Sequence, residues 1–522
     1  MKTAQPLELQ YPYTGLDARN NYQASSNPLV ASEPSIALKG SSVDITGLRE
    51  FEGYLKRDYG CIPLFTSAAL DGNPCLVIQY SQQDGDLYFV VVTDEKIYKY
   101  VSTPAWTSLG AYTGTALRRV CATVYNDLLL ITDRVNAIMQ WNGTTLAGVT
   151  GLEALLSTDL IAFNNHLLLF DLVENSGTVE IPIWTRYPQR IRWSNVNNIE
   201  DFVTGTSGLL TLGDSPDLYA GREMLGDQLI VYKSRTIYNL LYVGYPDIFK
   251  PVPVEKGRGL LAPDTLISFE GVHIFLGNDD VYAFNGQGLT SVGGAIKSLL
   301  FGPNAIVNPV YLGTSKARFY EDLGEYWLAV PIGTSTVPNE IFRLDVANKT
   351  WWRRGSQIKI TALGAWKKKN TISWDALVDS WEEQAWQWES SAMLAETAIP
   401  IIAGYSTLGD GVVNQVDFIN FLDNSITPEA YRVTEELSTI IKTRYSELWM
   451  EVQGEGQLKL SYSTDRGSSW TDLTTKTISQ NDWYTAKWGI NLSTDSIKFK
   501  LTMPSGNVKF RKAFAWTIGK KR

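Results

Sequence analysis

The stretch Leu266–Gly286, LISFEGVHIFLGNDDVYAFNG, carries the pattern that decides the fold. An apolar run at 266–269 ends at a Glu-Gly turn, a second run covers 272–276, and a third at 281–284 follows a polar turn and carries two aromatic residues. Short runs rich in β-branched and aromatic residues, separated by turn residues, are typical of β-strands. The stretch therefore predicts three consecutive short strands.

The same arrangement recurs along the chain. Predicted strands of the other units lie at 76–80, 87–92 and 96–100; at 122–125, 128–131 and 138–143; at 160–163, 167–170 and 190–193; at 229–232 and 236–238; and at 326–330, 341–345 and 351–352. The period is strand-like, which excludes helical solenoid repeats.

One aromatic landmark marks each unit, and the landmarks set the repeat length. They are Tyr98, Trp141, Trp193, Tyr238, Tyr282 and Phe342, with successive gaps of 43, 52, 45, 44 and 60 residues. A period of about 45 residues built from several short strands is typical of β-propeller blades. We expect an all-β chain with a β-propeller of six to eight blades, the seventh near residues 360–430, where the pattern is weaker.

The composition divides the chain into three predicted parts. Residues 1–40 lack a core-forming pattern, and we predict an extended N-terminal arm. This arm is either a disordered tail or a segment that orders against a neighbour. Residues 41–430 form the predicted propeller. Residues 431–522 alternate polar and apolar positions, as strands with one buried face do, and predict a C-terminal β-sandwich.

A tryptophan-rich stretch interrupts the last part of the propeller region. Trp374, Trp381, Trp386 and Trp388 allow a helix over 374–395. We expect these indoles to pack against the propeller edge, and a sugar-binding aromatic platform is the functional alternative.

Charge and cysteine content exclude several classes of protein. The formal net charge is −9, which argues against a protein that grips nucleic acid by neutralising phosphates, although DNA could still slide past an acidic wall. Three cysteines, Cys61, Cys75 and Cys121, give no disulfide framework and favour a reducing compartment. The start of the chain lacks the apolar core of a signal peptide, and no run approaches the ~20 apolar residues of a membrane helix.

Residues suited to catalysis are few. The two histidines, His166 and His273, lie in apolar strand patterns and are expected in the core. No HExxH, CxxC or P-loop motif occurs. Gly257–Ala262 mimics a dinucleotide fingerprint without its βαβ context and is expected to be a turn between blades. The acidic pairs Asp279-Asp280 and Asp214/Asp217 could bind Ca²⁺, but we expect solvated loop carboxylates. The sequence therefore predicts no enzyme, no catalytic residue, no cofactor and no metal.

One sharp motif lies near the C-terminus. Ser463–Trp470, STDRGSSW, matches the S-x-D-x-G-x-[ST]-W pattern of the Asp box, which is similar to hairpin turns of sialidase propellers. Asp465 can accept bonds from nearby backbone N–H groups and Gly467 supplies a permissive φ. We expect a structural turn.

Several segments, in this order, resemble the propeller proteins of bacteriophage tails, the nozzle or hub components of short-tailed phages, including the packaged-DNA stabilisation type. The most telling is Arg190–Phe202, RIRWSNVNNIEDF, which is similar to a recurring R-x-x-W-S-N … D-F/W segment. It is preceded by 16–19 and 55–60 and followed by 231–238, 259–263 and 281–286. The resemblance covers most of residues 10–520.

The resemblance implies a structural virion protein in the ring or nozzle around the DNA exit channel, below the portal and adaptor proteins. The implied partners are further copies of the chain in a hexamer, the portal and adaptor, tail fibre or tail needle/plug proteins, and double-stranded DNA passing without specific binding, with no membrane span. The implied location is the virion tail, and the host cytoplasm during assembly. Alternatives are a glycan-binding or sialidase-like propeller, a tail-tip or baseplate component of a longer-tailed phage, and a cellular scaffold propeller.

Overall fold

Strands make up most of the described residues, 63% of which lie in strands and 3% in helices. The computed structural model describes residues 4–9, 44–51, 54–64, 70–101, 105–113, 118–178, 180–213, 216–303, 305–367, 398–406, 408–418, 420–423, 426–434 and 436–518. The predicted all-β class is confirmed.

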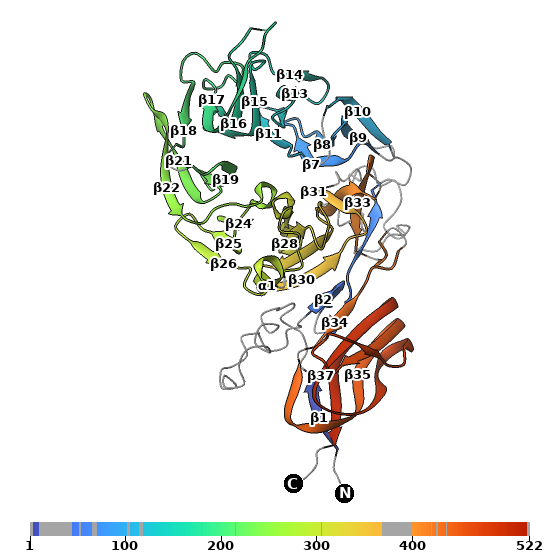
Figure 1. The fold of residues 1–522 in the computed structure, drawn as a ribbon. Helices are drawn as coiled ribbons and strands as arrows, with labels where there is room; N and C mark the ends of the chain where they lie inside the picture. Colours follow the sequence, from blue (N-terminus) through green and yellow to red (C-terminus); the bar gives the residue numbers. More distant parts are fainter. Residues whose placement is uncertain are drawn as a thin grey trace.

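Seven sheets surround a common axis as the blades of a β-propeller (Figure 1). In blades 1 to 6 the strands pair antiparallel in chain order, from the innermost strand to the rim. The blades are: blade 1, β7 (Pro74–Ser81), β8 (Leu87–Thr93), β9 (Lys96–Val101) and β10 (Ala105–Ala111); blade 2, β11 (Cys121–Tyr125), β12 (Leu128–Thr132), β13 (Met139–Trp141) and β14 (Leu146–Gly148); blade 3, β15 (Leu155–Phe163), β16 (His166–Asn175), β17 (Trp184–Trp193) and β18 (Gly208–Thr211); blade 4, β19 (Tyr219–Leu225), β20 (Gln228–Lys233), β21 (Thr236–Gly244) and β22 (Ile248–Lys256); blade 5, β23 (Ile267–Phe269), β24 (Val272–Leu276), β25 (Val281–Phe284) and β26 (Leu289–Ser291); blade 6, β27 (Lys316–Tyr320), β28 (Glu325–Val330), β29 (Glu340–Asp345) and β30 (Thr350–Gly355); and blade 7, β31 (Lys359–Trp366), β32 (Ile399–Tyr405) and β33 (Asp410–Asp417) with β5 (Gly60–Pro63) and β6 (Leu70–Asp71).

Short helices lie only between strands in the described residues. They are η3 (Pro263–Thr265), α1 (Lys297–Phe301), η4 (Leu312–Thr314) and η5 (Glu321–Leu323). None of them has the length and apolar character needed to cross a lipid bilayer.

Tight turns in the sequence explain why the inner hairpins form. Asn126 and Asp127 join β11 to β12 with φ of 45° and 60°, and Asn164 and Asn165 join β15 to β16 with φ of 47° and 60°. Two consecutive positive φ angles are required by the type I′ hairpin turn, and Asn and Asp tolerate them best among residues with a side chain. These turns place the flanking apolar runs directly opposite each other.

The core is divided among the contacts between blades. The buried apolar side chains of the described residues fall into seven clusters, and each cluster joins two successive blades around the ring. Leu129 and Trp141 of blade 2, for example, pack with Val90 and Val92 of blade 1. A blade has two apolar faces, so it is fully buried only when it has a neighbour on each side.

Blade 7 closes the ring with a strand from the other end of the propeller sequence. β5 pairs with β33, placing Cys61 opposite Val416 and Ile62 opposite Gln415. The buried Arg354 of blade 6 donates to Asp423 at 2.6 Å and contacts the Cys61 Sγ at 3.1 Å. This closure clasp ties the beginning of the propeller to its end, and it confirms the blade expected near 360–430.

The C-terminal strands form one nearly closed sheet, sheet A, beneath the propeller in Figure 1. Its long elements are β35 (Leu437–Ser463) and β37 (Lys476–Ile518), with β34 (Tyr431–Val433) and β36 (Thr471–Asp472). Leu448 lies opposite both Trp488 and Ala515, so two segments of β37 flank β35. The segments of alternating polar and apolar residues at 446–452, 457–462, 496–501 and 508–510 all lie within these elements.

Strands from the N-terminal part of the chain complete sheet A. β1 (Ala4–Leu9) pairs with the end of β37, β2 (Asp44–Thr46) with β34, and β3 (Leu48–Phe51) with β4 (Tyr54–Arg57), which meets β37. One apolar cluster runs from sheet A into blades 5 and 6. The buried Arg57 donates to the carbonyls of Pro428 and Met503, which binds these N-terminal strands to the C-terminal ones.

Two predictions concern residues that the structure does not describe. The helix predicted over 374–395 lies outside the described residues, with its four tryptophans. The predicted arm at 1–40 lies outside them too, except for β1. The boundaries at 40/41 and 430/431 stay predictions.

The closure clasp gives a test of ring stability. Arg354→Met should lower the free energy of unfolding by about 3–5 kcal/mol, because it leaves the Asp423 carboxylate buried beside other acidic groups without its cation. The double variant Arg354→Met/Asp423→Leu should recover part of the loss, since no unpaired charge remains. Urea unfolding followed by tryptophan fluorescence measures both, and equal stability of the two variants would contradict the role of the ion pair.

Candidate functional site

The innermost strands leave a small cavity on the propeller axis. Its volume is about 230 Å³, and its walls come from β7, β11, β19, η3, β23, β27 and β31. Cations project into it from three blades, among them Arg119, Arg222 and Lys316. Ligand sites are usually concave and lined by convergent polar groups, so this axial cavity is the candidate functional site.

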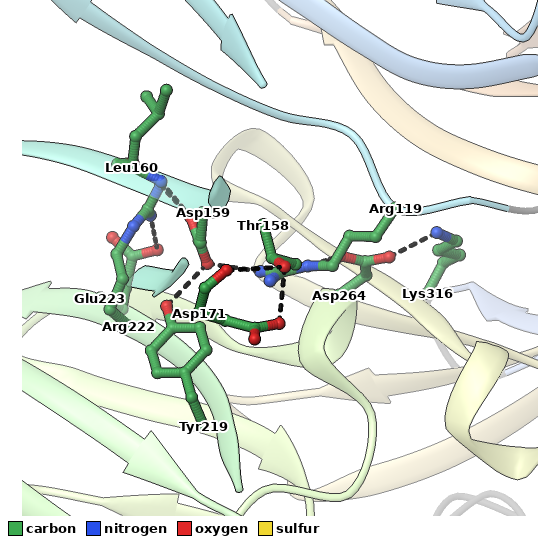
Figure 2. A network of polar contacts seen from close by, with 10 residues as sticks. All are labelled: Arg119, Thr158, Asp159, Leu160, Asp171, Tyr219, Arg222, Glu223, Asp264 and Lys316. Atoms are coloured by element: carbon green, nitrogen blue, oxygen red, sulfur yellow. Dashed lines mark hydrogen bonds and ion pairs between the residues drawn. The ribbon is translucent and has the colours of Figure 1, made fainter. Parts of the chain in front are cut away.

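Asp159 of β15 holds the centre of the polar network around this axis (Figure 2). The side chain is completely buried and accepts bonds from Arg119 Nη2 at 2.7 Å, Arg222 Nη2 at 2.9 Å and the Tyr219 hydroxyl at 2.9 Å. These partners precede β11 or lie in β19. One carboxylate therefore connects blades 2, 3 and 4.

A second carboxylate extends the network to the other side of the axis. Asp264 of η3 accepts Arg119 Nε at 2.9 Å and an ion pair from Lys316 at the start of β27. The ion pairs run in the order Lys316, Asp264, Arg119, Asp159 and Arg222, and join blades 6, 5, 2, 3 and 4. We call these five residues and Tyr219 the axial cluster.

The axial cluster keeps its charges despite burial. Burial opposes ionisation of Asp159, but Arg119 and Arg222 outweigh it and hold the carboxyl pKa below its ordinary value. For Asp264, burial is likewise outweighed by Lys316 and Arg119, which lower its pKa to about 2. The carboxylates in turn raise the pKa of the Arg119 guanidinium, against its own burial.

Glu223 differs from these acids. Burial raises its pKa, and the neighbouring Arg222 offsets the effect only in part. Arg318, exposed in the same cavity, also lowers the pKa of Glu223. Four cations and two carboxylates line the cavity, and the buried Asp159 beside it supplies a third carboxylate. Such a near balance of charge is expected where ion pairs hold neighbouring blades together.

The sequence interpretation did not single out the axial cluster. Its members are scattered from residue 119 to residue 316, and none forms a local motif. They share a structural position instead, in or just before the innermost strand of a blade. An alignment of the repeats to one another would have placed polar residues at this inner position, where an apolar residue is expected.

The two histidines lie in the core, where the sequence placed them. His166 is buried, with Nδ1 2.7 Å from the Ser194 carbonyl, and His273 is buried between the Tyr232 hydroxyl and the Met224 carbonyl, each at 2.9 Å. Burial lowers the pKa of His273. The three cysteines are buried and free. The expectation that both histidines are core residues is confirmed.

The acidic pairs serve local structure. Asp279 accepts the Tyr282 hydroxyl at 2.7 Å, and Asp280 accepts the Ser291 hydroxyl at 2.7 Å. Asp217 lies 3.1 Å from the Thr236 hydroxyl, and Asp214 is outside the described residues. Within the described ranges, no group of three or more His, Cys, Asp or Glu side chains is arranged to hold a metal ion. Residues 257–262 connect blades 4 and 5, as expected.

The Asp box forms the turn that its sequence predicts. Asp465 accepts the Ser463 hydroxyl at 2.6 Å and the Ser469 backbone N–H at 2.9 Å, and Gly467 has a φ of 99°. These hydrogen bonds hold the pKa of Asp465 well below its usual range. The turn joins β35 to β36 in sheet A, so it belongs to the architecture of that sheet and not to the axial cavity.

Exposed apolar side chains gather on two neighbouring blades. Of the twenty large hydrophobic side chains exposed in the described residues, twelve lie between Ile181 and Val252, in and beside blades 3 and 4. A groove of about 510 Å³ separates the rim strand β18 from the β21–β22 hairpin, with Leu209 on one wall and Tyr245 at the hairpin tip. With Val203 nearby in sequence, Leu209 and Tyr245 make this groove a candidate interaction surface. The sequence interpretation did not identify this surface.

Comparison with known proteins gives only distant structural likenesses. No protein-family model matches the chain, and no curated protein matches it. Among solved structures, a streptogramin B lyase is 12% identical over 69% of this chain and 98% of its own, with a TM-score of 0.39. The Neurospora crassa Pan2 WD40 domain is 11% identical over 70% and 98%, with a TM-score of 0.36, and the computationally designed Ika8 protein is 11% identical over 68% and 99%, with a TM-score of 0.37. These are propeller likenesses from which no activity is carried over.

A substitution of Asp159 tests whether the axial cluster stabilises the propeller. Asp159→Asn should destabilise the protein by about 3–5 kcal/mol, because Arg119 and Arg222 lose the buried carboxylate that they share, and only Asp264 and the more distant Glu223 remain as their counter-charges. Asp71→Asn, which removes an exposed pair with Lys96, should leave the unfolding midpoint unchanged. Thermal and urea unfolding measure both variants, and equal effects at the two positions would contradict the assignment.

Acid should weaken the ion pairs of the axial cluster in a defined pH window. The folded-state pKa of Asp264 is about 2 against an ordinary 3.8, so its stabilising contribution is complete above about pH 5 and is lost as the pH falls towards 2. The difference in unfolding free energy between wild type and Asp264→Asn should shrink by about 2 kcal/mol across that window. A constant difference from pH 7 to pH 2.5 would contradict the shift.

Proposed function

We propose that this chain is a structural protein of a bacteriophage tail, part of the ring or nozzle around the DNA exit channel below the portal and adaptor. The proposal starts from the sequence segments that resemble this family and follow one another in the same order, above all Arg190–Phe202. In the structure this segment covers the end of β17 and the turn that follows it, next to the surface where exposed apolar side chains gather.

The single observation that carries an assembly role is the apolar surface of blades 3 and 4. A monomeric protein gains nothing from exposing Val203 at 84% and Tyr245 at 86% on the same pair of blades. Burial of such side chains drives association between proteins, and aromatic residues contribute most at the centres of interfaces. The surface therefore fits a chain that works within a larger assembly.

The axial cluster restricts where DNA could pass. A duplex, whose major groove alone is about 12 Å wide, cannot enter a 230 Å³ cavity crossed by ion pairs. A conduit for DNA would have to lie between copies of the chain and not inside one propeller. The formal charge of −9 suits a wall that DNA passes without binding.

The proposal carries the partners expected from the resemblance. They are copies of the chain in a hexameric ring, the portal and adaptor proteins above it, and tail fibre or tail needle/plug proteins at its outer or lower surfaces. The proposed location is the virion tail, after assembly in the host cytoplasm, and the proposed role involves no catalysis. A tail-tip or baseplate position in a longer-tailed phage would use the same surfaces and differs only in the particle that contains the ring.

A sialidase-like function is the second candidate, because the axial cavity gathers arginines and Glu223, whose pKa is raised, with Tyr219 in the adjoining axial cluster. Sialidases use a tyrosine nucleophile. Here, however, the Tyr219 hydroxyl donates to Asp159, and two of the arginines are already occupied by the same carboxylate. A glycan array and a sialidase assay with the full chain separate the two candidates, and turnover of an anionic sugar would favour the enzyme.

Particle composition tests the proposed role. Mass spectrometry of virions purified from the phage that encodes the chain should detect it in several copies per particle, and negative-stain images of the purified protein should show rings with an open centre. Absence of the chain from purified virions would overturn the proposal.

The apolar surface gives a variant test of assembly. Leu209→Ala/Tyr245→Ala should weaken self-association or partner binding at least about tenfold, while the unfolding free energy changes by only ~0.5 kcal/mol because both side chains are exposed. Val310→Ala/Leu408→Ala is a matched control, since these side chains are 80% and 65% exposed elsewhere. Sedimentation velocity of the wild type and both variants measures the effect, and equal weakening in the control would contradict a specific surface.

A further inference from the structure

Charge is divided unequally between the two parts of the molecule. Residues 58–430 contain 25 Lys and Arg against 40 Asp and Glu, a formal charge of −15, whereas residues 431–522 contain 15 against 9, a charge of +6. Residues 1–57 are neutral, with six of each sign. The net charge of −9 therefore conceals a strongly acidic propeller and a basic C-terminal part.

The acidic charge is concentrated on one face of the propeller. In a four-stranded antiparallel blade, the turn between strands one and two and the turn between strands three and four lie on the same face. In blades 1 to 6, the described turns on this face carry one lysine, Lys349, and ten carboxylates. These are Asp84, Asp86, Asp127, Glu200, Asp201, Asp227, Asp247, Glu270, Glu321 and Asp322.

On blades 3 and 4 this acidic face meets the apolar surface. The exposed Glu200 lies in the same turn as Val203, between β17 and β18, and Asp247 lies beside Tyr245 in the β21–β22 turn. We call the turns 194–207 and 245–247 the acidic turn surface. It has exposed apolar side chains bordered by carboxylates, which is the usual composition of a protein interface.

Sheet A has an outward surface of the opposite charge. Leu55 and Phe510 are buried and lie opposite each other, so the alternation of the pleat turns Tyr54, Lys509 and Arg511 outward. Lys509 lies 5.0 Å from the centre of the Tyr54 ring, and Arg511 lies 4.1 Å from that of Trp483.

The next strands continue this surface. Lys487 lies 3.8 Å above the Trp449 ring, and Trp449 and Lys487 are register partners. A ring face fixes a cation in place without neutralising it, so its charge stays available to a carboxylate from outside. We call Tyr54, Trp449, Trp483, Lys487, Lys509 and Arg511 the cationic sheet surface.

We infer that the cationic sheet surface of one copy docks on the acidic turn surface of the next copy. Cations would meet Glu200 and Asp247, while the aromatic rings would cover Val203 and Tyr245. Because β18 and β22 lie on the far side of the propeller from sheet A, the two surfaces of one chain cannot meet each other (Figure 1). Such a head-to-tail contact is heterologous, and repeated around an axis it closes a ring. The inference rests on the proposed ring and names its interface.

DNA is the competing occupant of the cationic sheet surface. The rings of Trp449 and Trp483 each have a cation over one face, which leaves less aromatic surface for base stacking. Arg511 is also paired with Glu451 at 2.8 Å, so Lys487 and Lys509 are the cations that would meet the carboxylates of the second copy. A second copy of the chain, with its acidic turns, fits these features better.

Charge reversal in the full chain tests the inference. Glu200→Lys/Asp247→Lys and Lys487→Glu/Lys509→Glu should each raise the dissociation constant for self-association at least about tenfold, measured by mass photometry and sedimentation velocity. An equimolar mixture of the two variants should associate again, because the first keeps the cationic sheet surface and the second keeps the acidic turn surface. Association in the mixture also shows that both variants are folded.

Matched controls carry the same charge changes elsewhere. Glu270→Lys/Glu321→Lys, on blades 5 and 6 of the acidic face, is the control for Glu200→Lys/Asp247→Lys. Lys256→Glu/Lys349→Glu, on the propeller, is the control for Lys487→Glu/Lys509→Glu. Neither control pair should change self-association. Unchanged association of both test variants, or no recovery on mixing, would overturn the inference while leaving the ring in place. A wild-type chain that never associates would overturn the proposed function as well. Loss of duplex DNA binding in Lys487→Glu/Lys509→Glu with self-association intact would assign the surface to DNA.

Discussion

The structure depends on one constraint: a blade has two apolar faces and can bury both only between two neighbours. Six copies of a strand motif along the chain would leave two faces exposed at the ends of the row. The seventh blade removes these ends because β5, from the beginning of the propeller sequence, pairs with β33 from its end. The seven apolar clusters at the blade junctions follow from this closure, and Arg354 supports it by holding Asp423 beside Cys61.

Closure of the ring brings the inner strands of several blades close together around the axis. Ion pairs between blades, centred on Asp159 and Asp264, occupy this place. Buried charges are costly unless they are paired, so the cluster favours one arrangement of blades over slipped alternatives. The same cluster closes the axis to a large ligand, so the outer surfaces are where the proposed partners would bind.

The outer surfaces differ in composition between two distant parts of the molecule (Figure 1). Blades 3 and 4 present apolar side chains bordered by carboxylates, and sheet A presents cations resting on aromatic rings. A molecule with two complementary and distant surfaces is suited to repeated head-to-tail association. The proposed ring role and its interface both arise from this polarity, and the axial ion pairs keep the propeller rigid enough to hold the two surfaces in a fixed relation.

The sequence by itself determined the class of fold. Strand patterns such as 266–286, the Asn126-Asp127 turn and the Asp box are short-range signals, because local sterics and hydrogen bonding act within a few residues. The burial of His166 and His273 followed from the same patterns. The tertiary structure alone decided which strands share a sheet across the whole chain, as with β1 to β4 in sheet A and β5 in blade 7. It also decided that polar residues from Arg119 to Lys316 meet on one axis, since residues so distant in sequence become neighbours only after the ring has closed.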